Sequence, residues 1–321
     1  MSRLPPRRWL PGSAGPLDWI TENGVYLGLL ALIAFNVLFT PRFASLDNAR
    51  LQFVQVVPVA IVAVGMALVI GTKGIDLSVG SVMAISSALL PLYLGYGAGV
   101  AMLIALIGGV IVGLINGGLI AFIRLQPIVA TLALLVGARG VALVMAQGRL
   151  TEVFDPTLSW IGSDSLAGIP IVIIVALVAA LLVGILVERT TFGRYAVAIG
   201  DNPEASRLAG VPVGRTLITV YALSGLLAAV AGIVQTARLA ASDPSFVGNL
   251  IELSAITAVV VGGTPLSGGR VRLVGTLAGA MLMQLIGATL IAHDLRDSAT
   301  RMVQAAIILG AVYVQRARGS A

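Results

Sequence analysis

The sequence contains no cysteine and a single histidine, His293. The absence of cysteine excludes disulfides, thiolate-bound zinc, iron–sulfur clusters and thiol nucleophiles. One histidine argues against a histidine-built metal site and against a Ser-His-Asp triad. We therefore expect no metal site and no catalytic residue, and an enzyme is the weakest function class that these residues allow.

Charged residues are also scarce. They make up 11% of the chain and hydrophobic residues 58%, whereas an average soluble domain has about 25% charged residues. So few charges could not cover the apolar surface of a soluble protein, but a lipid bilayer solvates that surface directly. The net charge of +6 is scattered over short connecting segments, which is typical of membrane orientation signals and not of nucleic-acid binding.

Long apolar runs are abundant. A helix that crosses a bilayer needs about 20 mostly apolar residues, and these runs are continuous, which favours helices over an alternating β-barrel. We expect an all-α polytopic membrane helix bundle of about ten transmembrane helices, built as one domain over residues 1–321. The ten runs cover 24–40, 53–71, 77–95, 98–123, 127–147, 169–188, 216–238, 252–265, 272–292 and 300–315.

The basic residues indicate an orientation. If the N-terminus is cytoplasmic and all ten runs cross, thirteen of the twenty Lys and Arg residues lie inside, six lie outside and Arg139 lies within a span. The positive-inside rule then places both termini in the cytoplasm. This orientation makes 1–23 a cytoplasmic N-terminal segment, puts 148–168 outside, and makes 189–215 the largest cytoplasmic loop.

That cytoplasmic loop contains the signals of a short helix over 201–210. Asp201 or Asn202 can cap the first turn, and Pro203 suits the first helical position. Glu204 complements the positive start of the helix, and Gly210 suits its end. Two interpretations of the small apolar face of this helix stay open: it holds two spans together, or it docks into a groove of a soluble partner. The residues of that face are Ala205, Leu208 and Ala209.

Asp76 is an ionisable residue within an apolar stretch. Such a group is costly in lipid and usually faces protein or water. The neighbouring Gly71, Gly74 and Gly80 permit a non-helical break, which membranes tolerate where the backbone is buried or lines a cavity. One hypothesis is therefore a break beside a translocation path. The alternative is a plain cytoplasmic turn in which Lys73 and Asp76 pair in water.

Other polar residues interrupt the spans. Arg139 can snorkel or pair with a carboxylate, and we favour such structural pairing over contact with a solute. Uncharged groups make hydrogen bonds between helices by default, although a solute path would need the same groups. These uncharged residues are Asn116, Thr131, Gln235 and Gln284.

Several phrases resemble one family. TTFGRYAVAIGDNPEASRLAGV at 190–211 resembles the cytoplasmic loop of the ribose/xylose/arabinose-type permeases of bacterial ABC importers. GIDLSVGS, NG, QPIVATL, RG and VGGTPLSGGR follow one another in the order found in that family, at 74–81, 116–117, 126–132, 139–140 and 261–270. LQPIVATL and TLSWIGS are similar to phrases of galactofuranose importers, whereas Lys73 stands where the family usually has a small residue.

The resemblance implies a type II ABC importer-like permease and assigns roles to particular positions. The coupling helix to the ATPase would comprise or adjoin Asn202, Glu204, Ala205, Arg207, Ala209 and Gly210. The candidates for the translocation path or helix break are Gly74, Asp76, Ser78, Gly80, Asn116, Thr131 and Arg139. The late Gly-rich turn would contain Gly262, Gly263, Gly268 and Gly269.

The resemblance also implies a function: movement of a monosaccharide, galactofuranose or a related pentose or hexose, across the bacterial inner membrane. The expected partners are a tandem-domain ABC ATPase that binds ATP and Mg, a periplasmic sugar-binding protein, and a second permease chain, identical or paralogous. We expect no cofactor on this chain and no nucleic acid. The segment 266–269 (LSGG) matches an ATPase signature by letters, but the sequence lacks the G-x-x-x-x-G-K-[ST] phosphate loop.

Two other transporter classes remain. An ABC permease for branched-chain amino acids would share the architecture, although the GIDLSVG phrase favours sugars. An ion-coupled secondary transporter would need intramembrane carboxylates, for which the sequence offers Asp76 as the one serious candidate.

Overall fold

The computed structural model describes residues 23–295, with the further residues 298, 302, 303, 305, 306 and 310. The expected cytoplasmic segment 1–23 therefore lies outside the described residues except for Asn23, and so does most of the tenth apolar run. The first nine runs each coincide with a helix. Seven described helices are long and apolar enough to cross a membrane, and α2 and α12 are shorter. The described residues thus form a polytopic helical membrane protein with fewer full-length spans than the expected ten.

The described residues form a nearly all-helical chain with four two-residue strands. The strands form two antiparallel pairs, β1 with β4 and β2 with β3. The elements are α2 (Gly24–Phe39), α3 (Leu46–Gly71), α4 (Val79–Tyr93), the 3-10 turn η1 (Leu94–Tyr96), α5 (Ala98–Ala121), α6 (Pro127–Met145), β1 (Thr151–Glu152), α7 (Pro156–Ser163), β2 (Ser165–Leu166), β3 (Ile169–Pro170), α8 (Ile171–Arg189), α9 (Thr191–Asp201), α10 (Pro203–Leu208), α11 (Val213–Leu239), β4 (Ala241–Ser242), α12 (Ile251–Val261) and α13 (Leu273–Ala292).

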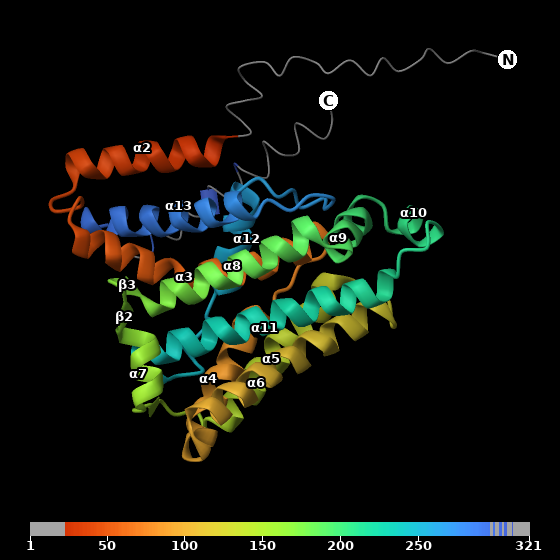
Figure 1. Cartoon of the computed structure of the whole chain (residues 1–321), viewed down its shortest axis with the longest axis horizontal. Coiled ribbons are helices and arrows are strands. Elements are labelled where there is room, and N and C mark those ends of the chain that lie inside the picture. The colour runs from red at the N-terminus through yellow and green to blue at the C-terminus, as the bar shows by residue number, and fades with distance from the viewer. Residues whose placement is uncertain (1–22, 296–297, 299–301, 304, 307–309, 311–321) are drawn as a thin grey trace, which may run out of the picture.

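The long helices run side by side, so the bundle has two ends (Figure 1). Helices α9 and α10 lie at one end, which we call the α10 end, and α7 lies at the other, the α7 end. Helix α11 is central and packs most extensively against α5, where glycines allow close approach of the two backbones. A Cβ on Gly113 or Gly117 of α5 would overlap the backbone of α11 at Tyr221 or Ile218.

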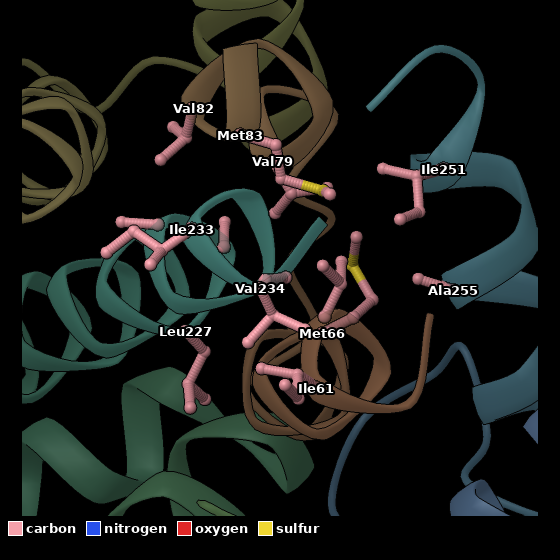
Figure 2. Close-up of a cluster of buried hydrophobic side chains, with 14 of the residues drawn as sticks. Ile61, Met66, Val79, Val82, Met83, Leu227, Ile233, Val234, Ile251 and Ala255 are labelled. Atoms are coloured by element: carbon pink, nitrogen blue, oxygen red, sulfur yellow. The ribbon is translucent and has the colours of Figure 1, made fainter. Parts of the chain in front are cut away.

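An apolar core fills the space between α3, α4, α11 and α12 (Figure 2). Ile61 and Met66 of α3 lie opposite Val79 and Met83 of α4, and Ile251 of α12 closes the cluster. The lipid-facing surface is apolar as well, because α8 exposes leucines along its length. An apolar outside and a packed inside are what a bilayer-spanning bundle requires.

Helix α4 begins halfway along the bundle. It meets Gly232 of α11 at Met83, four residues after its own start. Gly232 lies nineteen residues from the start of α11, or about 29 Å at 1.5 Å per residue. The chain from Gly71, at the α10 end, must therefore climb back into the bundle before α4 starts. We call this stretch, together with the last residue of α3 and the first two residues of α4 (71–80), the first re-entrant segment.

Helix α12 also begins inside the bundle. It has 11 residues where the antiparallel α13 has 20, so it covers about 17 Å beside about 30 Å. Its end packs at the start of α13, because a Cβ on Gly262 would overlap Gly275. The chain that leaves β4 at the α7 end therefore returns into the bundle before α12. We call this stretch, 243–250, the second re-entrant segment.

Candidate functional site

The first re-entrant segment is held by Asp76, whose side chain is 1% exposed. Its Oδ1 atom accepts hydrogen bonds from the Ser78 backbone N–H (3.0 Å) and hydroxyl (2.7 Å). Its Oδ2 atom accepts a hydrogen bond from the Ser224 hydroxyl of α11 (2.8 Å). Asn116 of α5 donates in turn to the Ser78 hydroxyl (2.8 Å). One carboxylate thus ties the start of α4 to two spans.

This geometry excludes the plain turn in water. Lys73 is exposed and adopts a left-handed φ of 66°, while Asp76 is enclosed by protein. Gly74 is required at its position because a Cβ there would overlap the Tyr221 hydroxyl. The structure therefore has the backbone break inside the bundle; that a translocation path runs beside this break stays a hypothesis. Backbone of this kind is tolerated at membrane depth because protein surrounds it.

Helix α6 contributes to both re-entrant segments. The Thr131 hydroxyl donates to the Ile75 carbonyl of the first segment (3.1 Å). Arg139, two turns further on, donates to the carbonyl oxygens of Pro244 (2.7 Å), Val247 (2.7 Å) and Gly248 (3.3 Å) in the second. Backbone carbonyls thus accept the hydrogen bonds of this guanidinium, because the second re-entrant segment leaves these acceptors unused. Sequence reasoning did not foresee these partners.

The two re-entrant segments meet at a pair of glycines. A Cβ on Gly80 would overlap the Gly248 carbonyl, and a Cβ on Gly248 would overlap the Gly80 carbonyl. Gly248 also has a φ of 71°, which side chains rarely adopt. The Glu252 carboxylate, in the first turn of α12, lies against Gly80 and attracts Arg139 electrostatically. Glu252 is buried as well. The sequence had indicated Asp76 as the one serious candidate for a carboxylate inside the bundle, and the structure adds Glu252.

The Gly-rich turn meets the first re-entrant segment at the α10 end. The Gly269 backbone N–H donates to the Gly71 carbonyl (3.0 Å). Gly200, at the end of α9, lies against both, because a Cβ there would overlap the Gly71 carbonyl and the Gly269 nitrogen. Gly268 lies close to the backbone nitrogen of Lys73. We call these contacts between Gly71, Gly200 and Gly269 the glycine junction. The other two glycines of the turn lie elsewhere, with Gly262 against α13 and Gly263 beside Arg272.

Helix α10 has the start and stop that the sequence indicates. The Asn202 side chain accepts hydrogen bonds from the backbone N–H groups of Glu204 (3.1 Å) and Ala205 (3.0 Å). Gly210 follows the helix with a φ of 81°. Glu204 and Arg207 form an exposed ion pair (3.0 Å). Ala205 and Ala209 are exposed too, and the side chain of Leu208 is 84% exposed, so the apolar face does not pack on the spans.

Helix α9 connects α10 to the bundle. Its start is capped by the Thr190 hydroxyl, which accepts a hydrogen bond from the Gly193 N–H (3.4 Å). Ala196 and Ile199 are buried, while Arg194 and Tyr195 are exposed. Sequence reasoning missed this helix as an element, although the alternation of small buried and polar exposed residues over 191–201 has the helical period.

A cavity of about 290 Å³ opens between α3, α11, the second re-entrant segment and the start of α12. Of the polar residues that line it, sequence reasoning singled out Gln235 alone. The available signal was polar residues on apolar helices, and it applied to Gln55, Arg238 and Ser254 as well. Phe246 and Asn249 lie in the second re-entrant segment, which reads as a loop in the sequence. The polar and aromatic lining residues are Gln55, Gln235, Arg238, Phe246, Asn249 and Ser254.

The remaining chemistry of the described residues is limited. They contain no group of three or more His, Asp or Glu side chains that could hold a metal ion. A larger groove of about 620 Å³ between α5, α8 and α11 has an apolar lining of Leu, Ile, Val and Ala residues. Such a groove suits lipid chains and offers a polar solute nothing to bind.

Comparison with known proteins gives a consistent match. Residues 51–312 match the family described as "Branched-chain amino acid transport system / permease component". A galactofuranose transporter permease protein of Escherichia coli (strain K12) is 37% identical over 322 residues, covering 96% of this chain and 94% of the relative. A ribose import permease protein of the same strain is 38% identical over 303 residues, covering 92% and 94%. A fructose import permease protein of Bifidobacterium longum (strain NCC 2705) is 39% identical over 254 residues, covering 77% and 71%.

Proposed function

We propose a function on the basis of the family to which this chain belongs, the branched-chain amino acid transport system / permease component family. We propose that it is the membrane-spanning permease subunit of a bacterial ABC importer and that it carries a monosaccharide into the cell. The three similar permeases are named for galactofuranose, ribose and fructose, and each of these is a small neutral sugar. The ordered phrases from GIDLSVGS to VGGTPLSGGR support sugars over amino acids.

Energy for transport must come from another subunit. The sequence has no phosphate-binding G-x-x-x-x-G-K-[ST] loop, so the ATP and Mg would be bound by a partner ATPase. Helix α10 is the surface that suits this partner, because it presents an exposed apolar residue, Leu208, at the end of the bundle. The α10 end is then the cytoplasmic end, in agreement with the positive-inside count, and both termini are cytoplasmic.

The other partners follow from the same orientation. The α7 end faces the periplasm of an inner-membrane protein, where a sugar-binding protein would deliver the substrate. A second permease chain, identical or paralogous, completes the complex. The similarity to transporter permease subunits supports the proposal that this chain acts as a transporter subunit and not as an enzyme.

A single observation carries the proposal: an unbroken set of backbone contacts joins the docking surface to the buried break. Helix α10 continues from α9, α9 ends at the glycine junction, and Gly71 of that junction begins the first re-entrant segment. Because each contact is glycine against backbone, a shift of α10 cannot be absorbed by a flexible side chain. It must move 72–78 and the start of α4.

The proposal is tested by reconstitution in liposomes with the partner ATPase and binding protein. We expect uptake of labelled D-ribose, D-fructose or D-galactose that requires ATP and the ATPase. Uptake driven by a proton or sodium gradient through this chain alone would instead support an ion-coupled transporter, with Asp76 or Glu252 as the coupling carboxylate. Uptake of leucine in preference to all three sugars would support an amino-acid permease.

A further inference from the structure

The cavity between α3, α11 and α12 combines polar side chains with a position among the spans. The side chains of Gln235, Arg238, Asn249 and Ser254 have no hydrogen-bond partner within the described residues. All four are at least partly exposed. In lipid, unsatisfied polar groups cost several kcal/mol each, so such groups usually face protein or water. Their orientation toward one cavity indicates that this cavity is hydrated.

The cavity lies at the same depth in the bundle as the two re-entrant segments. Gly248 and Ile251 line it, and they belong to the second re-entrant segment and to the first turn of α12. Gly248 touches Gly80 at the start of α4. The cavity therefore adjoins the contact between the second re-entrant segment and the start of α4. Substrate sites of transporters are typically formed where discontinuous helices leave backbone and polar groups free near the membrane midplane.

The lining determines the chemistry of the occupant. Amide, hydroxyl and guanidinium groups from Gln235, Ser254 and Arg238 supply both donors and acceptors, as a polyhydroxylated molecule needs. Phe246, whose side chain is 62% exposed, supplies an apolar face for the C–H side of a sugar ring. Among the residues that the structure describes, the lining contains no carboxylate. The volume of about 290 Å³ is at the small end of pockets for drug-sized ligands, roughly 300–1,000 Å³, which limits the occupant to a small molecule.

We propose that this cavity is the sugar-selective station of the translocation path, in which Gln235, Arg238, Asn249 and Ser254 hydrogen-bond the hydroxyls of a monosaccharide and Phe246 contacts its ring. This inference rests on the proposed function and adds the residues that select the substrate. The Asp76 carboxylate, by contrast, already accepts three hydrogen bonds from protein groups and has a positional role. A sugar site and a backbone-positioning site thus lie on either side of the Gly80–Gly248 contact.

The absence of native cysteine permits a direct test of hydration. In permeabilised membrane vesicles that carry the whole importer, Ser254→Cys places a thiol in the cavity, and Leu181→Cys places one on the exposed, lipid-facing side of α8. We expect a cationic methanethiosulfonate reagent to label the first variant at least tenfold faster than the second, because the reagent reacts with thiols that meet water. Equal, slow labelling of both variants would overturn the proposal.

Uptake measurements test the sugar. In the reconstituted importer we expect Gln235→Leu and Phe246→Ala each to reduce uptake of D-ribose, D-fructose or D-galactose at least fivefold. Both variants should still copurify with the ATPase, which shows that they fold. Phe39→Ala is the matched control, because Phe39 is also 62% exposed but lies on α2, away from the cavity.

The outcomes separate the two proposals. A wild-type importer that takes up none of the three sugars overturns the proposed function. A wild-type importer that takes them up, together with Gln235→Leu and Phe246→Ala variants that match it in rate and in preference among the sugars, overturns the cavity assignment alone.

Discussion

Asp76 is the residue on which the first re-entrant segment depends. Its two carboxylate oxygens receive three hydrogen bonds, from the backbone and side chain of Ser78 and from Ser224. A buried carboxylate is stabilised only when such donors replace the water that it loses. The network therefore replaces the water that the buried carboxyl group loses, and it fixes the point at which α4 starts.

We expect Asp76→Ala to destabilise the protein by about 2–4 kcal/mol, because it leaves buried donors without partners at about 1–3 kcal/mol each. Sugar uptake should fall at least tenfold. The midpoint of thermal unfolding in detergent and reconstituted uptake measure the two effects. Asp155→Ala is the control: Asp155 caps α7 through the N–H groups of Thr157 and Leu158, a contribution of about 1 kcal/mol. Equal losses of stability in the two variants would show that the Asp76 network stabilises the protein no more than an ordinary helix cap does.

The contact between Gly80 and Gly248 is the second feature at the residue scale. We expect Gly80→Ala to abolish uptake, because the added Cβ overlaps the Gly248 carbonyl and forces the two re-entrant segments apart. Gly137→Ala, on α6, adds a Cβ that meets nothing within 4 Å. This control should be neutral or slightly stabilising, since alanine favours helix by about 0.5–1 kcal/mol. Normal uptake by Gly80→Ala would show that the contact is dispensable.

At the scale of elements, the short helices are where sequence reasoning succeeded and failed. Pro203, Glu204 and Gly210 predicted α10 because a capped helix is specified by its own few residues. The half-length of α12 was not predictable, because an apolar run of 252–265 reads as a span whether it starts in lipid or beside a cavity. The same limitation hid the cavity, whose residues come from three helices and one re-entrant segment that are distant in the sequence.

Leu208 offers the sharpest test of α10 as a docking element. We expect Leu208→Asp to lower the amount of ATPase that copurifies with the permease at least tenfold, because a carboxylate replaces an apolar side chain that a partner groove would bury. Leu166→Asp is matched to it, since Leu166 is an exposed leucine at the α7 end, and it should leave copurification unchanged. Equal retention of the ATPase by both variants would place the docking surface elsewhere.

At the scale of the whole molecule, one set of backbone contacts joins α9 and α10 to the first re-entrant segment. Composition identified a membrane protein, because a lipid bilayer solvates the surface of a chain with 58% hydrophobic and 11% charged residues. The continuous apolar runs then identified helices. The positive-inside count and the ordered phrases then indicated an importer subunit. The path from α10 to Asp76 needed the structure, since it depends on glycines of three separate segments, Gly71, Gly200 and Gly269, that meet only in the folded chain.

The central claim is that this glycine junction transmits the action of the ATPase to the first re-entrant segment. It is tested most directly by the number of sugar molecules taken up per ATP hydrolysed by the reconstituted importer with Gly200→Ala in the permease. A Cβ at Gly200 overlaps the Gly71 carbonyl and loosens the junction without touching α10. We expect the ATPase to copurify normally and the ratio to fall at least fivefold. An unchanged ratio would contradict the account.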